Sequence, residues 1–356
     1  MSRNATSAPR QRSSRLGTAI QQSLREGLAA RLFSAAAAGV STADGERVTF
    51  AIGSPSFGER QLVTTSSLFD LASLTKTYTA VTAMDLVDRG EIDLDAPVSK
   101  VLNVGTGPAA DRITLRMLLR HTSGLPAVSE IWRDPSIPPD DRLRRVLSSE
   151  LVAEPDRTFI YSCPGYVAIG ALIEAATGST LVEAMHTSVF APLGLDATRF
   201  GPVGPTDAVA TEYEPHVGRG LVRGEVHDEL SWYLGGQTGN AGLFAPVTEV
   251  LTLAEALVGR GALPAHLVKV MMQSSVTPDQ GISFGHGLGV RIGDAATMGS
   301  SRVWGHTGFT GTLWVIDPAM GWAATLLTNR VHPDRSAVKI APFRRAFVDS
   351  IYAAML

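Results

Sequence analysis

Cysteine and lysine are scarce in this 356-residue sequence, which has one cysteine, Cys163, and four lysines among 31 basic side chains. A single cysteine excludes an internal disulfide and is typical of a reducing compartment, so we expect a cytoplasmic protein. No stretch of eighteen apolar residues occurs, which predicts that the chain does not span a membrane. The sequence also lacks a P-loop, a dinucleotide-binding glycine pattern and a His-Glu-x-x-His zinc motif.

The chain also lacks an excess of charge of either sign. Its formal net charge is −3, which argues against a nucleic-acid or membrane-surface partner. With 44% apolar and 18% charged residues, its composition is that of an ordinary globular protein. Because 356 residues exceed the usual size of one domain, we expect two lobes around a shared core.

The two ends of the sequence carry the strand patterns, and the middle carries the helical ones. Residues 1–15 are rich in Ser and Arg and are expected to form a disordered arm. A helix over 16–31 precedes a predicted hairpin, and strands return after residue 285 before a last helix. The predicted strands are 34–40, 47–52, 288–292, 302–305, 312–316 and 322–328, and the last helix is 341–355.

This arrangement predicts an α/β (α+β) fold with one antiparallel sheet built from both termini and flanked by helices. An α/β lobe would comprise 16–80 and 285–356, and 81–284 would form an inserted, mostly helical lobe. The helices predicted before or within this lobe are 73–88, 115–120, 140–151, 166–176, 181–189, 247–257 and 264–273. A ligand site would then lie in the cleft between the lobes.

Ser73-Leu74-Thr75-Lys76 is the strongest candidate for chemistry. Residues three apart share a helix face, so the Ser73 hydroxyl and the Lys76 amine can meet. Lysine in an arginine-rich chain indicates a need for a removable proton, and the hypothesis requires an unprotonated amine beside the alcohol. A second Ser-x-x-Lys, Ser336 to Lys339, lies in a polar stretch and is expected to be the solvated start of the last helix.

Two further segments are candidates for the same site. Tyr161 lies in a loop before a helix and can act as a general acid or base if cations lower its pKa; alternatively, it is an ordinary packed tyrosine. In the segment from His306 to Phe309, Gly308 permits close approach of the backbone to a ligand. The Phe309 and Ser73 N–H groups could form an oxyanion hole, although this segment is also compatible with a plain strand kinked at glycine.

Two histidine segments have no zinc-ligand spacing to a second His or Cys. His227-Asp228-Glu229 is expected to order a loop at the rim of the cleft. His121 is expected to bond the last carbonyls of a helix.

In this order, the segments resemble the serine β-lactamase and penicillin-binding-protein-like superfamily, especially its class C β-lactamase, esterase and D,D-carboxypeptidase-like branch. Further stretches that carry the resemblance are 118–126, 161–166, 224–229, 241–244, 305–312, 316–318 and 328–333. The resemblance implies that Ser73 is the acylated nucleophile and that Lys76 and Tyr161 share the activating proton. It also implies that Ser73 and Phe309 form the oxyanion hole, and it implies no metal or organic cofactor.

The resemblance further assigns substrate binding to four positions, Cys163, His306, Thr307 and Gly308, and two of these depart from the family pattern. Cys163 stands where the family usually has asparagine, and a thiol is a weak donor and acceptor. His306 stands where many relatives have a lysine, and histidine is mostly neutral at pH 7. Both changes favour uncharged ester or thioester substrates over β-lactams, which carry a carboxylate.

The leading hypothesis is a cytoplasmic serine hydrolase that acts through an acyl-enzyme on ester-type small-molecule substrates, with amides and thioesters as further substrate types. One alternative is an acyl transferase or peptide cyclase on the same scaffold. A second is a catalytically silent binding or sensor protein that retains the fold. The sequence leaves the oligomeric state open.

Overall fold

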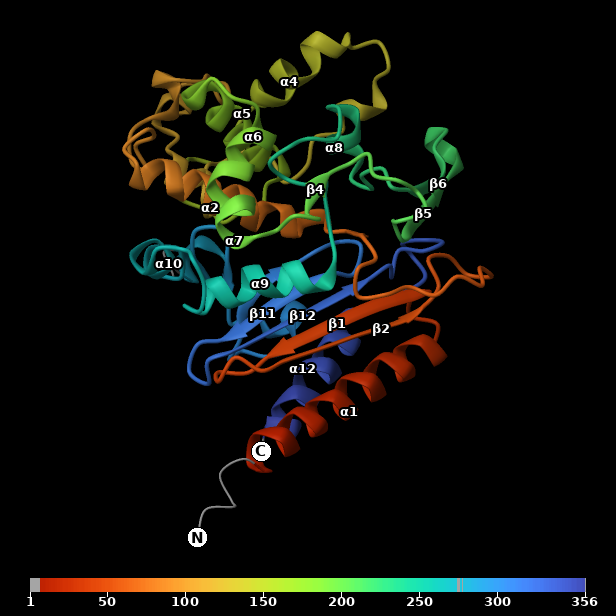
Figure 1. Ribbon diagram of the computed structural model, residues 1–356. Coiled ribbons are helices and arrows are strands. Elements are labelled where there is room, and N and C mark those ends of the chain that lie inside the picture. The colour runs from red at the N-terminus through yellow and green to blue at the C-terminus, as the bar shows by residue number, and fades with distance from the viewer. Residues whose placement is uncertain (1–6, 274–275, 277, 356) are drawn as a thin grey trace.

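The computed structural model describes residues 7–273, 276 and 278–355, and a seven-stranded antiparallel sheet lies at its centre. The strand order is β2-β1-β12-β11-β10-β9-β8, so strands from the two ends of the chain pair in the middle (Figure 1). The strands of this sheet are β1 Ala35–Ser41, β2 Arg47–Gly53, β8 Gly285–His286, β9 Arg291–Ile292, β10 Trp304–Thr307, β11 Leu313–Asp317 and β12 Trp322–Thr328.

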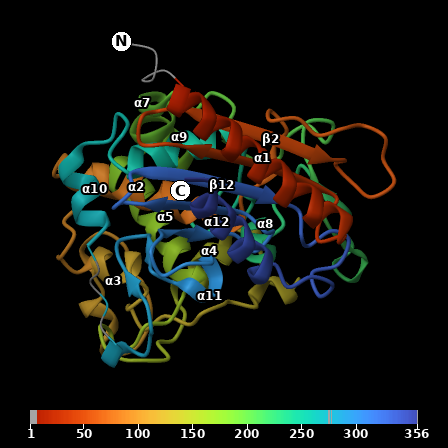
Figure 2. The ribbon, with the colours of Figure 1, turned by 90° about the horizontal axis from the view of Figure 1, so that it is seen from below.

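Helices cover both faces of the sheet. Helices α1 and α12 lie side by side beneath it, and α9 crosses the opposite face (Figures 1 and 2). Most of the other helices gather above α9, where α2 and α5 form much of the buried interior, whereas α11 packs against α12. The helices are α1 Ser7–Ala29, α2 Thr75–Asp88, α3 Leu115–Leu119, α4 Pro139–Leu147, α5 Cys163–Thr177, α6 Leu181–Met185, α7 Ala191–Leu193, α8 Glu229–Tyr233, α9 Val247–Leu257, α10 Ala265–Met271, α11 Ala295–Met298 and α12 Ala341–Met355.

Strand β1 shows why the sheet is the centre of the molecule. Its seven residues are all buried, and successive side chains point to opposite faces. Ala36, Ala38 and Val40 belong to the core formed with α1 and α12, whereas Ala35 and Ala37 belong to the larger core that contains α9. Small side chains on this strand allow the covering helices to approach the sheet closely.

The predicted fold class is confirmed: one antiparallel sheet unites both termini, terminal helices flank it, and a largely helical region is inserted. Helices α9 and α12 and strand β12 begin and end at the predicted residues. The lobe boundaries at 81 and 284 stay a prediction, although α9 lies between them in sequence and packs on the sheet.

Several predicted elements differ from those observed. Helix α1 begins at Ser7, so residues 7–15 are helical and not part of a disordered arm; residues 1–6 lie outside the described residues. Of the strand predicted over 288–292, only β9 at 291–292 is observed, because a turn closed by the Gly287 N–H and the Val290 carbonyl separates it from β8 at 285–286. Exposed Ser336 and Lys339 precede α12 rather than beginning it.

The inserted region also contains two small sheets that were not predicted. They have the strand orders β3-β7-β4 and β5-β6. Such short strands carry too little periodic signal to be recognised from sequence. Their bounds are β3 Phe69–Asp70, β4 Arg199–Phe200, β5 Ala210–Glu214, β6 Gly220–Arg223 and β7 Leu243–Ala245. Within the described residues, no single helix combines the length and apolar character needed to cross a membrane.

Candidate active site

Ser73 lies in a short 3₁₀ turn, Ala72–Leu74, that leads into the buried helix α2. Ala72 has a φ of +48°, a left-handed conformation that is strained for a residue other than glycine. The buried carboxylate of Asp70 holds this turn, since one oxygen accepts the Ala72 N–H at 2.7 Å and the other the His227 N–H at 2.6 Å. Ser73 itself remains partly exposed.

Lys76, one turn along, is fully buried and points at Ser73. Its Nζ lies 3.0 Å from Ser73 Oγ and 3.0 Å from the Asn240 carbonyl oxygen. Cys163 Sγ is 3.6 Å away. The structure therefore brings together three of the residues that the sequence singled out, Ser73, Lys76 and Cys163, although Asn240 was not anticipated.

The pKa of Lys76 depends on opposing effects of its buried surroundings. Burial lowers the pKa of Lys76, whereas negative charge on Cys163 and Tyr161 would raise it above its ordinary value. Burial also raises the pKa of the Cys163 thiol, against the opposing effect of Lys76, so this thiol is neutral near pH 7. The unprotonated amine therefore stays a prediction, and in either form Lys76 Nζ contacts Ser73 Oγ and the Asn240 carbonyl.

Tyr161 lies between two cations. The Lys76 Nζ is 5.1 Å from the centre of its ring, and the Arg291 guanidinium carbon is 5.0 Å from it. The His121 and His306 rings lie 4.4 and 6.0 Å from the Tyr161 ring, centre to centre. Tyr161 is therefore part of the same cluster as Ser73 and Lys76, with its ring beside two cationic side chains.

His306, on β10, is buried and uncharged. Burial, aided by nearby Arg291 and Lys76, lowers the pKa of His306 well below its ordinary value. Its Nδ1 is 3.0 Å from the Thr307 carbonyl oxygen. A carbonyl can only accept, so Nδ1 carries the hydrogen and Nε2 keeps a lone pair. That Nε2 has no hydrogen-bond partner within the described part of the chain.

Two more histidines were not recognised as neighbours of the site. His121 bonds the Leu118 carbonyl at the end of α3 through its backbone N–H at 3.2 Å, whereas its ring Nδ1 accepts the Ser162 N–H at 3.0 Å and its backbone has a φ of +61°. His286 Nδ1 donates to the Gly287 carbonyl at 2.7 Å. Burial lowers the pKa of His121 well below its usual value and that of His286 to about 3. Both rings are therefore neutral near pH 7.

Arg291 is the other residue that sequence reasoning missed. It reaches the site because β9 pairs with β10, which places Arg291 opposite Gly305. Its guanidinium is paired with Asp294 at 2.5 Å. No local pattern marks this residue in the sequence, since its place depends on a strand pairing.

The segment after β10 is fastened to the segment that precedes Ser73. The Thr310 hydroxyl donates to the Asp70 carbonyl at 2.8 Å, and the Thr312 hydroxyl donates to the Leu71 carbonyl at 3.0 Å. A Cβ on Gly308 would clash with Thr312 Oγ1 and lie 2.6 Å from the Leu71 carbonyl oxygen, so this close approach requires glycine.

The two predicted oxyanion-hole donors lie in these joined segments. Within the described residues, neither the Ser73 nor the Phe309 N–H has a hydrogen-bond acceptor. Both groups are therefore free to donate to a substrate oxygen.

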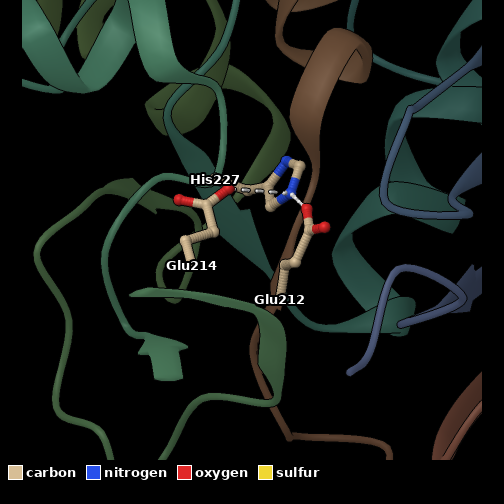
Figure 3. A group of neighbouring side chains, drawn as sticks. All are labelled: Glu212, Glu214 and His227. Atoms are coloured by element: carbon tan, nitrogen blue, oxygen red, sulfur yellow. Dashed lines mark hydrogen bonds and ion pairs between the residues drawn. The ribbon is translucent and has the colours of Figure 1, made fainter. Parts of the chain in front are cut away.

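A second group of ionisable side chains, Glu212, Glu214 and His227, offers three possible metal ligands within 4.8 Å of one another (Figure 3). Guanidinium groups already occupy both carboxylates: Arg335 lies 2.6 Å from Glu212 and 2.7 Å from Glu214, and Arg219 lies 3.2 Å from Glu214. These residues fit an ion-pair cluster better than a metal site.

The ion-pair cluster also borders the candidate site, as expected for His227. The His227 ring stacks on Phe309 with centres 5.7 Å apart, and its Nε2 lies 2.8 Å from Glu212. The cluster thus supports the segment that carries one predicted oxyanion donor.

Comparisons with known proteins agree with this architecture. The model of the family described as "Beta-lactamase" matches residues 20–349. A protein of Salmonella agona (strain SL483) named "Putative D-alanyl-D-alanine carboxypeptidase" is 31% identical over 337 residues, which cover 82% of this chain and 76% of that protein.

Solved structures share the fold over nearly the whole chain. EstCE1, described as a hydrolase with promiscuous acyltransferase activity, aligns with a TM-score of 0.79 and 22% identity, over 96% of this chain and 99% of that one. A class C β-lactamase from Rhodobacter sphaeroides aligns with a TM-score of 0.73 and 20% identity, over 95% and 99% of the two chains.

Proposed function

Because the chain belongs to the β-lactamase family of serine hydrolases, we propose that it hydrolyses small ester substrates through an acyl-enzyme on Ser73. The observation that carries this proposal is the 3.0 Å contact between Ser73 Oγ and Lys76 Nζ beside two unoccupied N–H donors. Hydrolysis of an amide or a thioester would use the same acyl-transfer chemistry. A cytoplasmic location stays our expectation from the single cysteine.

In the proposed mechanism, Ser73 Oγ attacks the ester carbonyl while Lys76 and Tyr161 share the activating proton. We assign the Tyr161 oxygen as the acceptor of the Ser73 proton and Lys76 as the ammonium that donates to Ser73 Oγ, because Lys76 Nζ lies 3.0 Å from that oxygen and 5.1 Å from the centre of the Tyr161 ring. The same proton then passes to the leaving alcohol. Water attacks the acyl group, gives a proton to Tyr161, and Ser73 is released with its hydrogen restored.

The oxyanion formed in both steps would accept hydrogen bonds from the Ser73 and Phe309 N–H groups. Thr310 and Thr312 hold the two segments together, so these donors are positioned before substrate arrives.

Substrate preference follows from positions 306 and 163. A neutral His306 whose Nε2 keeps a lone pair offers no attraction to a carboxylate beside the scissile bond. The Cys163 thiol at 3.6 Å from Lys76 is a weaker partner for a substrate amide than an asparagine side chain. We therefore propose a preference for esters that are uncharged next to the reacting carbonyl.

The direct test is turnover of 4-nitrophenyl acetate together with labelling by a fluorophosphonate and peptide mapping. Wild-type protein should carry the label on Ser73. Ser73→Ala should lose the label and at least about 10³-fold in kcat/KM, because no other group replaces the nucleophile. Ser336→Ala, in the second Ser-x-x-Lys, is the matched control and should behave as wild type. Wild-type turnover by Ser73→Ala would refute the proposal.

The same assay separates the two alternatives from hydrolysis. An acyl transferase should form amide or ester products when a panel of amines and alcohols is added, which mass spectrometry detects. A silent binding protein should be folded by circular dichroism yet take up no fluorophosphonate. A set of hydrolysis products alone, across the whole panel, supports the hydrolase.

The reason for the substrate preference is testable at position 306. His306→Lys should raise kcat/KM for an ester with a carboxylate next to the scissile bond by about tenfold relative to its neutral analogue. An unchanged ratio of the two substrates would contradict the role given to His306.

A further inference from the structure

A cavity of about 580 Å³ is lined by residues of the turn Ile131–Arg133, of α4 and of α8. The two helices α4 and α8 are labelled in Figure 1. The walls of the cavity are mainly aromatic, formed by Trp132, Trp232 and Tyr233 with a proline and a valine. Trp232 is 37% exposed, so its indole is accessible to a ligand.

The charged residues that line this cavity, within the part of the chain that is described, are both arginines, Arg133 and Arg142. The Arg142 guanidinium carbon lies 3.9 Å from the centre of the Tyr233 ring, and its Nη1 donates to the Tyr233 carbonyl at 2.8 Å. Its Nε is buried without a hydrogen-bond partner, and no carboxylate of the described residues pairs with this side chain. Arg142 thus places an uncompensated positive charge against an aromatic wall.

The other arginine is only weakly compensated. Arg133 lies with its guanidinium carbon 4.3 Å from the centre of the Trp132 ring, and it pairs with Glu130 at 3.2 Å. Both members of that pair are largely exposed, so solvent screens the interaction. The cavity therefore offers aromatic faces and net positive charge together.

A small apolar cluster links the cavity to the catalytic cluster. Trp132 and Cys163 both pack against this apolar cluster, which contains Leu230 of α8, and Cys163 Sγ is 3.6 Å from Lys76 Nζ. Asp228 caps the N-terminus of α8, and its carboxylate accepts a hydrogen bond from Asn240 at 3.1 Å. Residues that contact Lys76 thus also pack against or bond the elements that form the cavity walls.

We propose that this cavity is a subsite for an aromatic group bearing a carboxylate, located on the substrate away from the scissile carbonyl. The assignment as a substrate subsite rests on the proposed esterase function. An arene can stack on the indole faces, and its carboxylate can form paired hydrogen bonds with the Arg142 guanidinium. A neutral arene would leave that guanidinium unpaired, and an aliphatic anion would not use the aromatic walls.

Such a substrate is compatible with the neutral position 306. His306 disfavours a carboxylate beside the reacting carbonyl, whereas Arg142 favours one at a distance from it. The structure thus separates the place where charge is recognised from the place where the bond is cleaved.

The first experiment measures binding without catalysis, on Ser73→Ala protein. Indole-3-propionate and its neutral amide, indole-3-propionamide, are compared by isothermal titration calorimetry. The acid should bind about tenfold more tightly than the amide. Arg142→Gln should remove that difference, and Trp232→Leu should weaken both ligands about fivefold. Arg145→Gln, an exposed arginine on the same helix that does not line the cavity, should change neither.

The second experiment tests whether the cavity takes part of the substrate. A series of 4-nitrophenyl esters carries acyl chains of increasing length that end in either a benzoate or a benzamide group. At the chain length that spans the distance from the scissile carbonyl to the cavity, the benzoate ester should have a kcat/KM about tenfold higher than the benzamide ester. Arg142→Gln should abolish this preference without changing 4-nitrophenyl acetate turnover. No benzoate preference at any length would overturn the subsite assignment, and equal binding of the indole acid and amide would overturn the ligand class.

Failure of the proposed function gives a different result. In that case fluorophosphonate would not label Ser73, yet the acid would still bind more tightly than the amide in an Arg142-dependent manner. The site would then stand as an aromatic-anion site without the esterase.

Discussion

The protein holds two buried clusters of ionisable side chains that differ in how completely those side chains are paired. Around Tyr161, the Nε2 atoms of three buried histidines, His121, His286 and His306, have no hydrogen-bond partner in the described part of the chain. In the ion-pair cluster of Figure 3, by contrast, a guanidinium contacts each carboxylate, and Glu212 also contacts His227.

The two clusters can be told apart by how their polar groups are paired, but not by the types of residue they contain. Two glutamates and a histidine are as typical of a metal site as serine, lysine and tyrosine are of a hydrolase. The glutamates, however, form ion pairs with Arg335 and Arg219. In the Ser73 cluster, two N–H groups have no acceptor and the backbone at Ala72 is strained. Polar groups that remain available are the better sign of chemistry.

The largest effect on catalysis is expected from a substitution of Lys76 in the Ser73 cluster. Lys76→Arg keeps a positive charge but replaces the compact ammonium that fits between Ser73 Oγ and the Asn240 carbonyl with a larger, planar guanidinium. We expect kcat for 4-nitrophenyl acetate to fall about 10²- to 10⁴-fold.

The control for this prediction is the second Ser-x-x-Lys. Lys339→Arg, at an exposed position before α12, should leave kcat within about twofold of wild type. Equal activity of Lys76→Arg and Lys339→Arg would mean that the buried lysine has no part in the chemistry.

Sequence reasoning reached the Ser73–Lys76 pair because both residues lie within one turn of one element, where spacing determines contact. It reached the sheet for a similar reason, since alternation and length marked strands such as β12. It missed Asn240, Arg291 and His286 because these side chains reach the site only through tertiary pairings, such as that of Gly305 with Arg291. The protonation of Lys76 depends on buried neighbours that local spacing does not reveal, so the unprotonated amine stays a prediction.

The second prediction sharpens the comparison at the oxyanion segment. Gly308→Ala places a methyl group against Thr312 Oγ1 and the Leu71 carbonyl, so the segment that carries Phe309 must move away from Ser73. We expect an unfolding free energy lower by about 2–4 kcal/mol and a large loss of kcat. Urea denaturation and ester turnover measure the two effects.

Gly17→Ala is the matched control for that substitution. A Cβ at Gly17 in α1 would meet only ordinary contacts, at 3.6 Å from Phe50, and alanine favours helix. This variant should be as stable as wild type or more so, with unchanged turnover. If Gly308→Ala behaves like it, the two segments do not need their close approach.

The third prediction concerns the ion-pair cluster at low pH. Although burial opposes it, hydrogen bonds from His227 and Arg335 lower the pKa of Glu212 to about 2. Glu212 therefore contributes stability above pH 4.5, and this is lost as the pH falls toward 2. Glu212→Gln should be less stable at pH 7 by up to about 2 kcal/mol, once solvent screening is allowed for. Its difference from wild type in urea denaturation should shrink between pH 4.5 and 2, while ester turnover at pH 7 changes little.

The smallest effect, and the one that distinguishes the clusters by pH, is expected at His286. Burial lowers the pKa of His286 to about 3, so the folded protein leaves this ring neutral while the unfolded chain protonates it below about pH 6.5. Above pH 6.5 the buried His286 ring does not lower the free energy of unfolding, because it is neutral in both states. As the pH falls toward 3, the free energy of unfolding decreases by up to about 1.4 kcal/mol for each pH unit. His286→Gln cannot titrate, so the wild-type protein should lose about 1 kcal/mol more than the variant between pH 6.5 and 5.5 in urea denaturation. Glu212→Gln should show no such difference in that interval, because the contribution of Glu212 to stability begins to fall only below about pH 4.5. If His286→Gln and wild type keep parallel pH profiles there, the ring is not held neutral, and the distinction between an unpaired and a paired cluster loses its support.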